Sequence, residues 1–242
     1  MPTALPPPSS RGALLLAILA YFVVKTFVPF GGTILYPLTL LATWIHEMGH
    51  GLTALAVGGH FERLEVFGDA SGLAHTATSH PWQSGLTSAG GLVAPPIVGA
   101  LLLMVSRGPR RARVALALLA ATVVVSLAVW VRSLAGWIAL PIDAAILGAF
   151  AAAGSPRSRM VFAQLVGITL AIDTVSRADY LFSRSATIEG ISRPSDVSAV
   201  ADAFGGSYLV WGLAIGACSL AFLAVGLRLA WRDQPPRAVR SR

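Results

Sequence analysis

Cysteine, lysine and charge are all scarce in this sequence. It contains one cysteine, Cys218, and one lysine, Lys25, and charged residues make up only 12% of its 242 residues. A single cysteine excludes an internal disulfide framework and a cysteine-based metal cluster. A soluble domain of this length carries roughly twice that charged fraction. The composition therefore indicates an integral membrane protein.

Apolar residues and arginine are abundant in the sequence. Hydrophobic residues make up 55% of the chain, and the mean hydropathy is +0.71. A net charge of +7 on a soluble protein would suggest a nucleic-acid partner, but here the arginines cluster between apolar runs. That pattern is typical of membrane-topology control. We therefore expect no nucleic-acid partner, and we expect the lipid bilayer around most of the chain.

Seven apolar runs are long enough to cross a bilayer. They lie near residues 12–30, 33–57, 84–106, 112–131, 134–154, 158–176 and 208–231. The runs predict an all-α polytopic membrane protein, a bundle of about seven transmembrane helices with a short β-hairpin after the second.

One membrane domain would cover residues 12–231. A Pro-rich disordered lead at 1–11 would precede it, and a basic cytoplasmic tail at 232–242 would follow it. The first run lacks a small-residue cleavage site, so we expect it to stay as an anchor.

Arginine clusters predict the orientation of the bundle. They follow the third, fifth and seventh apolar runs, and seven spans would bring all three clusters to one side. The positive-inside rule makes that side cytoplasmic. We therefore expect a multi-pass protein of the cell membrane, with its N-terminus outside and its C-terminus in the cytoplasm.

Two segments are too polar to span. Residues 60–80 alternate in polarity around a Gly/Asp-rich turn at 68–72, which predicts a β-hairpin. Residues 177–207 are rich in arginine and aspartate. Both segments should lie on the outer side of the membrane.

The second apolar run contains His46-Glu47-Met48-Gly49-His50, an HExxH motif. On a helix His46 and His50 differ by about 40° around the axis, so both imidazoles can bind one Zn²⁺. Glu47 is rotated by about 100° and can reach a metal-bound water as its general base. Ionisable groups at this depth in a bilayer are costly, which favours a functional metal site over a chance match.

A catalytic zinc site needs a third protein ligand and an open position for water. Within the apolar runs the candidates are Asp143 and Asp173, and a rise of about 1.5 Å per residue puts both at a depth compatible with the histidines. Each has another possible role. Asp173 is spaced for an i,i+4 ion pair with Arg177, and Asp143 follows Pro141 near a helix N-terminus. Depth leaves both candidates open.

The segment YPLTLLATWIHEMGHGLTALAVGG resembles the first motif of the site-2 protease family of intramembrane zinc metalloproteases. The segments FGDASGLAHT, SAGGLVAPPIVGALLL, WVRSLAGW and SDVSAVADAFGGSYLVWG resemble later segments of its small branch without an inserted PDZ domain. The resemblance implies that His46 and His50 are zinc ligands and that Glu47 is the catalytic acid/base.

The wider family takes its third ligand from the aspartate of an Asn-Pro-x-Asp-Gly motif on a later span. This chain has LPIDAA around Asp143, which lacks the asparagine and the glycine. We therefore expect the third metal ligand to come from the late segment IDTVSRADY, with Asp173 preferred and Asp179 as its alternative.

The expected function is hydrolysis of peptide bonds in membrane-protein or membrane-associated peptide substrates by a zinc-activated water. The hairpin at 60–80 could add a strand to an extended substrate. One alternative is an inactive membrane scaffold that retains a metal site. Another is a metal or small-molecule transporter that uses His46, His50 and Asp173 in transit, although few polar residues line the other spans. The sequence indicates neither the substrate nor the oligomeric state.

Overall fold

The computed structural model describes residues 10–188 and 190–231. The helices are α1 (Ser10–Phe27), α2 (Gly31–Ala56), α3 (Pro81–Val105), α4 (Pro109–Val129), α5 (Leu134–Ala153), α6 (Pro156–Ser176), α7 (Ala178–Leu181), α8 (Asp196–Phe204) and α9 (Tyr208–Trp231). The strands are β1 (His60–Val66), β2 (Gly72–Ala77), β3 (Ser185–Ile188) and β4 (Ile191–Pro194). The expected basic tail at 232–242 lies outside the described residues. So does the expected lead, except that Ser10 and Arg11 begin α1.

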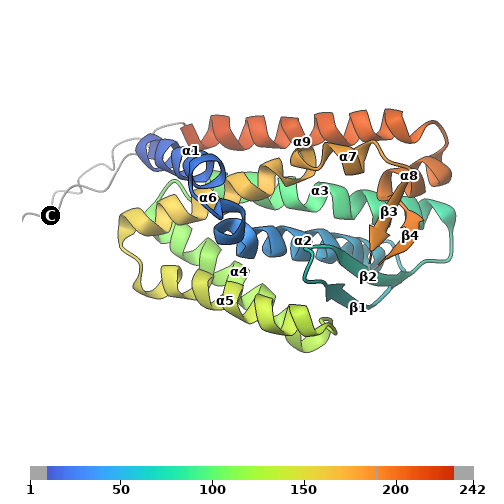
Figure 1. The fold of residues 1–242 in the computed structure, drawn as a ribbon, viewed down its shortest axis with the longest axis horizontal. Helices are drawn as coiled ribbons and strands as arrows, with labels where there is room; N and C mark the ends of the chain where they lie inside the picture. The colour runs from blue at the N-terminus through green and yellow to red at the C-terminus, as the bar shows by residue number, and fades with distance from the viewer. Residues whose placement is uncertain (1–9, 189, 232–242) are drawn as a thin grey trace, which may run out of the picture.

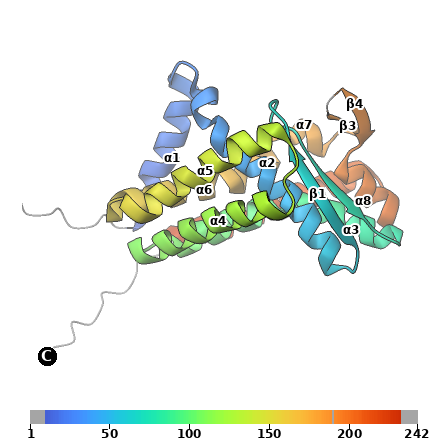
Figure 2. The same ribbon diagram turned by 90° about the horizontal axis from the view of Figure 1, so that it is seen from below.

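The long helices form a bundle around α3. This helix packs against α2, α6, α8 and α9, and α4 and α5 form an antiparallel pair along one side (Figures 1 and 2). Small residues let the backbones approach closely: a Cβ at Gly99 of α3 would lie 2.6 Å from the carbonyl oxygen of Gly167 on α6. The predicted all-α polytopic bundle, with a hairpin after its second helix, is confirmed.

Large apolar side chains cover much of the outside of the bundle. Examples are Leu118 on α4, Ile138 on α5 and Leu213 on α9, each about 60% exposed. Soluble monomers rarely expose contiguous apolar surface on this scale. The exposed faces therefore suit contact with lipid tails.

Fewer helices qualify as spans than the sequence predicts. Among the described residues, five are long and apolar enough to cross a membrane, namely α3, α4, α5, α6 and α9. The prediction of about seven is therefore wrong. Helix α2 has 26 residues, but the polar side chains of its HExxH motif lower its hydropathy. Helix α1 meets α2 after Phe30, which has a left-handed φ of 59°, and the two helices form a V (Figure 2).

The arginine clusters gather at one end of the bundle. The α3–α4 turn, the α5–α6 turn and the end of α9 all lie at the left of Figure 1, opposite the two hairpins. Arg11 at the start of α1 donates a hydrogen bond to the carbonyl of Trp231 at the end of α9. The two ends of the described chain therefore lie together, so the predicted placement of the N- and C-termini on opposite sides is not supported. That placement depended on counting the run at 12–30 as a crossing, and α1 is not among the described helices that qualify as spans.

The predicted hairpin at 60–80 forms, with β1 paired antiparallel to β2 from His60↔Ala77 to Val66↔Gly72. The outer edge of β1 is covered, because Leu64 exchanges backbone hydrogen bonds with Trp130 and Arg132. In the part of the chain that the structure describes, no strand pairs with the other edge of β2. That edge faces the site described below.

The polar segment at 177–207 folds into α7, the β3–β4 hairpin and α8. The residues that flank the β3–β4 hairpin are hydrogen-bonded to each other. The Ser195 hydroxyl donates to the carbonyl of Ser183 at 2.6 Å, and the Ser195 N–H donates to the carbonyl of Arg184 at 3.0 Å. Ser195 also caps α8 by accepting a hydrogen bond from the N–H of Ser198. The residue after this cap is Asp196.

Candidate metal centre

His46 and His50 lie one turn apart on α2, and their side chains converge. Their Nε2 atoms are 3.0 Å apart, and the ring planes meet at 85°. Both side chains are largely buried, with exposed fractions of 19% and 11%. Two imidazole nitrogens this close favour a shared ligand.

Asp196, the first residue of α8, completes the cluster. Its Oδ2 lies 3.1 Å from Nε2 of His46 and 3.4 Å from Nε2 of His50. Ligand atoms of a tetrahedral zinc with bonds of 2.0–2.1 Å are about 3.3 Å apart, so these three atoms match one face of such a site. The fourth position of the tetrahedron is the one that a catalytic zinc leaves to water. The cluster of His46, His50 and Asp196 therefore fits a divalent metal.

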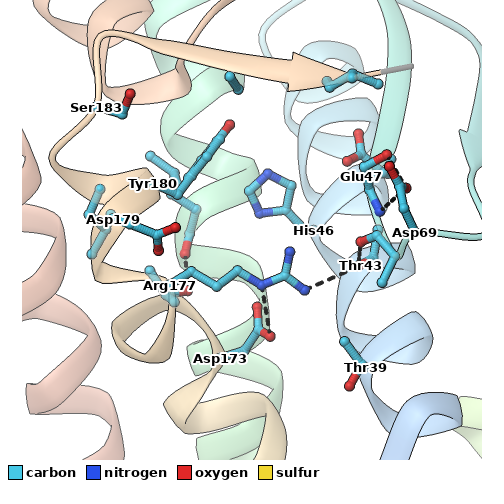
Figure 3. Close-up of a pocket in the computed structure, with 18 of the residues that line it drawn as sticks. Thr39, Thr43, His46, Glu47, Asp69, Asp173, Arg177, Asp179, Tyr180 and Ser183 are labelled. Atoms are coloured by element: carbon cyan, nitrogen blue, oxygen red, sulfur yellow. Dashed lines mark hydrogen bonds and ion pairs between the residues drawn. The ribbon is translucent and has the colours of Figure 1, made fainter. Parts of the chain in front are cut away.

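The preferred third ligand, Asp173, lies outside that cluster. Its Oδ1 accepts a hydrogen bond from Nε of Arg177 at 3.3 Å, the i,i+4 pair that was its alternative role. Arg177 also donates from Nη2 to the hydroxyl of Thr43 on α2 (Figure 3). The geometry thus replaces Asp173 with Asp196 as the candidate third ligand.

The other two aspartates considered from the sequence are also outside the cluster. Asp143 is buried in α5, where its Oδ2 has no hydrogen-bond partner among the described residues. Asp179 is exposed on α7 and lines the larger cavity beside His46. Asp196 is not one of the predicted candidates because it lies in the polar segment at 177–207, outside the apolar runs. Its signal was the Pro-Ser-Asp sequence at 194–196, which is typical of a helix start with an acidic first turn.

His50 is held in one orientation by α3. Its Nδ1 lies 2.9 Å from the carbonyl oxygen of Thr87, so Nδ1 carries the proton and Nε2 is free to bind a metal. Gly91 gives the ring its space, because a Cβ there would lie 2.2 Å from Cε1 of His50. The α2–α3 contact thus fixes both the tautomer and the position of this ligand.

Glu47 is not a member of the cluster and lies against β2, in the cavity that reaches His50 and Asp196. It is only 5% exposed, and the N–H of Ala74 donates to its carboxylate. Gly72 leaves room for it, since a Cβ at position 72 would lie 2.6 Å from Oε1. Glu47 is therefore beside the metal cluster and in contact with the free edge of β2.

In the described part of the chain, a larger and a smaller cavity reach the cluster, and both are lined by His46, Glu47, Gly72 and Tyr180. The larger, of about 750 Å³, extends between α1, α2, α6 and the β3 strand. Figure 3 shows Asp179 and Arg177 on one side of it, with Glu47 and Asp69 on the other. The smaller, of about 210 Å³, lies between β2 and the β3–β4 hairpin and also reaches His50 and Asp196. Water and an extended peptide thus have room beside the cluster.

The electrostatics of the cluster favour an ionised Asp196. Burial alone would raise the pKa of this carboxyl, but when the two rings are protonated, the charge of His50 and hydrogen bonds from both histidines hold that pKa well below its usual range. The Tyr180 hydroxyl donates to Oδ2 of Asp196 at 2.7 Å. Burial, followed by the Asp196 charge, raises the pKa of Tyr180 above its usual range, so its hydroxyl stays a donor.

The fold and the cluster define a multi-pass membrane protein with a His–His–Asp site suited to a metal ion. A family model described as Peptidase M50B-like matches residues 13–226, and the protein belongs to this peptidase family. The resemblance to site-2 proteases is thereby confirmed. Searches of curated proteins and of solved structures find no match.

Proposed function

We propose that this protein is an intramembrane zinc metallopeptidase that hydrolyses peptide bonds of membrane-embedded or membrane-associated polypeptides. One observation carries the proposal: three metal-ligating atoms lie 3.0–3.4 Å from one another, with the buried Glu47 next in sequence to one of the ligands. Membership of the Peptidase M50B-like family supports the same activity.

Nε2 of His46, Nε2 of His50 and Oδ2 of Asp196 would hold the metal. Two imidazoles and one carboxylate are a ligand set of hydrolytic zinc enzymes, and they suit zinc better than magnesium or calcium, which prefer oxygen ligands. Bound zinc would lower the pKa of its water to about 7 and polarise the carbonyl to be attacked.

Glu47 would move the proton. Its carboxylate accepts the proton of the attacking water and later returns it to the amine that leaves, which is general base and general acid catalysis by one group. The N–H of Ala74 and the closeness of Gly72 hold this carboxylate in place between the cluster and β2. These contacts would keep the carboxylate between the proposed metal site and the strand edge proposed to bind the substrate.

The free edge of β2 would bind the substrate. A peptide bond inside a helix is shielded by its own hydrogen bonds, so the substrate must be extended near the scissile bond. An extended segment can pair with an unpaired strand edge through backbone hydrogen bonds. The smaller cavity runs along β2 past Glu47, His50 and Asp196, which would bring that segment to the metal.

We further propose that the arginine-rich end of the bundle faces the cytoplasm, as the positive-inside rule predicts. The candidate site and both hairpins then lie towards the outer face, because they occupy the opposite end (Figure 1). Cleavage would take place in the outer half of the membrane or at its surface.

The test compares the purified full-length chain with Glu47→Gln and His46→Ala variants. The probes are zinc content, measured by mass spectrometry, and cleavage of a panel of fluorogenic single-span peptides in proteoliposomes. We expect Glu47→Gln to bind zinc but not to cleave, and His46→Ala to do neither. Cleavage by Glu47→Gln at the wild-type rate would overturn the proposal, and zinc binding without cleavage by the wild type would favour a scaffold.

A further inference from the structure

We propose that Tyr180 is a positioning residue for the third metal ligand: its hydroxyl fixes the Asp196 carboxylate where His46 and His50 need it. This inference rests on the proposed metal site and adds to it a residue outside the HExxH motif.

The hydroxyl binds the oxygen that faces the histidines. Tyr180 donates to Oδ2 of Asp196 at 2.7 Å, and that same atom lies 3.1 Å and 3.4 Å from the two Nε2 atoms. A carboxylate oxygen has lone pairs for more than one partner, so Oδ2 can keep this hydrogen bond while it ligates a metal. The terminal torsion angle of an aspartate side chain varies over a broad range, and a hydrogen bond from a directional donor restricts that range.

Asp196 needs such support because it comes from a different part of the chain. It is separated from His46 by 150 residues, whereas the two histidines are fixed relative to each other by one helical turn. Asp196 follows the β3–β4 hairpin, and Tyr180 precedes it. The bond from Tyr180 to Asp196 therefore closes the base of this hairpin, beside the backbone contacts that Ser195 makes with Ser183 and Arg184.

Tyr180 is itself held by packing that does not need its hydroxyl. Its ring lies against a buried apolar cluster that includes Leu92, Leu181, Val197 and Ile215. Its ring also approaches His46 edge-on, with centroids 6.4 Å apart at 78°. Removal of the hydroxyl alone should leave the ring in place and release only the carboxylate.

The matched control is Tyr208. It packs against the same apolar cluster, and its ring lies 5.1 Å from the guanidinium carbon of Arg184. It is not a hydrogen-bond partner of Asp196 among the described contacts. Tyr208→Phe therefore makes the same chemical change in the same cluster without touching the candidate ligand.

The experiment measures zinc affinity of the full-length protein in lipid nanodiscs by competition with a chromophoric chelator, together with the thermal midpoint with and without zinc. Support from hydrogen-bonded neighbours of metal ligands is typically worth 10- to 100-fold in affinity, so we expect Tyr180→Phe to lose about tenfold or more. Its metal-free midpoint should fall only slightly, because Ser195 keeps its contacts with Ser183 and Arg184, and its zinc-induced rise should shrink. Tyr208→Phe should behave like the wild type.

A double-mutant cycle separates positioning from general stability. In an Asp196→Ala background, Tyr180→Phe should not change zinc affinity any further, because the carboxylate that the Tyr180 hydroxyl is proposed to position is already absent. Wild-type affinity in Tyr180→Phe, or an equal loss in both backgrounds, would overturn the inference and leave the proposed function standing. Absence of zinc binding by the wild type would instead overturn the proposed metal site and this inference with it.

Discussion

Gly72 of β2 lies directly against Glu47 of α2: a Cβ at position 72 would lie 2.6 Å from Oε1 and 2.7 Å from Cγ of the glutamate. The strand edge proposed to bind substrate and the residue proposed to move the proton are therefore in van der Waals contact. A side chain larger than hydrogen at position 72 cannot be added unless Glu47 shifts.

Gly72→Ala should therefore reduce cleavage while zinc binding persists. Misplacement of a catalytic group by about 1 Å can cost about 100-fold in rate, and we expect a loss of that order in kcat/KM. The control is Gly68→Ala in the turn of the same hairpin, where a Cβ would meet nothing within 4 Å. Equal activity in both variants would show that Gly72 does not set the position of Glu47.

Gly91→Ala should instead weaken metal binding. The added methyl would lie 2.2 Å from Cε1 and 2.3 Å from Nε2 of His50, so the imidazole must leave its position. We expect zinc affinity to fall at least about tenfold, as when a ligand loses its support. Gly148→Ala on α5, where a Cβ would meet nothing within 4 Å, is the matched control. Chelator competition on both variants measures the effect, and unchanged affinity in Gly91→Ala would contradict it.

Asp196→Asn and Asp173→Asn should separate the two candidate ligands. Asp196→Asn should lower zinc content sharply, because an amide replaces the ionised ligand. Asp173→Asn should keep its zinc, because this carboxylate pairs with Arg177 and is not a member of the cluster. Arg177 is 38% exposed, so the loss of the pair should cost less than about 1 kcal/mol of unfolding free energy. Zinc loss in Asp173→Asn with zinc retained in Asp196→Asn would reverse the assignment.

The single cysteine makes the orientation testable by labelling. On a Cys218→Ala background, Gly68→Cys places a thiol in the β1–β2 turn, and Ser155→Cys places one in the α5–α6 turn at the opposite end of the bundle. A membrane-impermeant maleimide added to intact cells should label the cysteine at position 68, and the cysteine at 155 only after permeabilisation. The reverse pattern would place the arginine-rich end outside.

Local periodicity made much of this protein predictable. The convergence of His46 and His50 follows from a spacing of four residues on one helix, and the β1–β2 hairpin follows from alternation around a Gly/Asp turn. The ends of the long helices lie within a few residues of the apolar runs for the same reason.

Features that depend on tertiary structure were not predictable in this way. Asp196 reaches the histidines because α8 folds back onto α3, and no local pattern encodes that return. The span count was too high because the runs at 12–30 and 33–57 were both counted, whereas α1 and α2 are not among the helices that qualify as spans in the described part of the chain. The expected side of the N-terminus depended on that count, and the contact between Arg11 and Trp231 does not support it.

The distance of 150 residues between His46 and Asp196 also bears on how the protein is made. A ribosome-bound chain acquires HExxH early, when only α1 and α2 have left the ribosome, yet it lacks Asp196, the proposed third ligand, until almost all of the remaining helices have been synthesised. Incomplete chains would therefore carry the signature of a peptidase without its metal centre. Synthesis order alone would keep the peptidase inactive during insertion, when unfolded membrane segments, its own included, lie within reach.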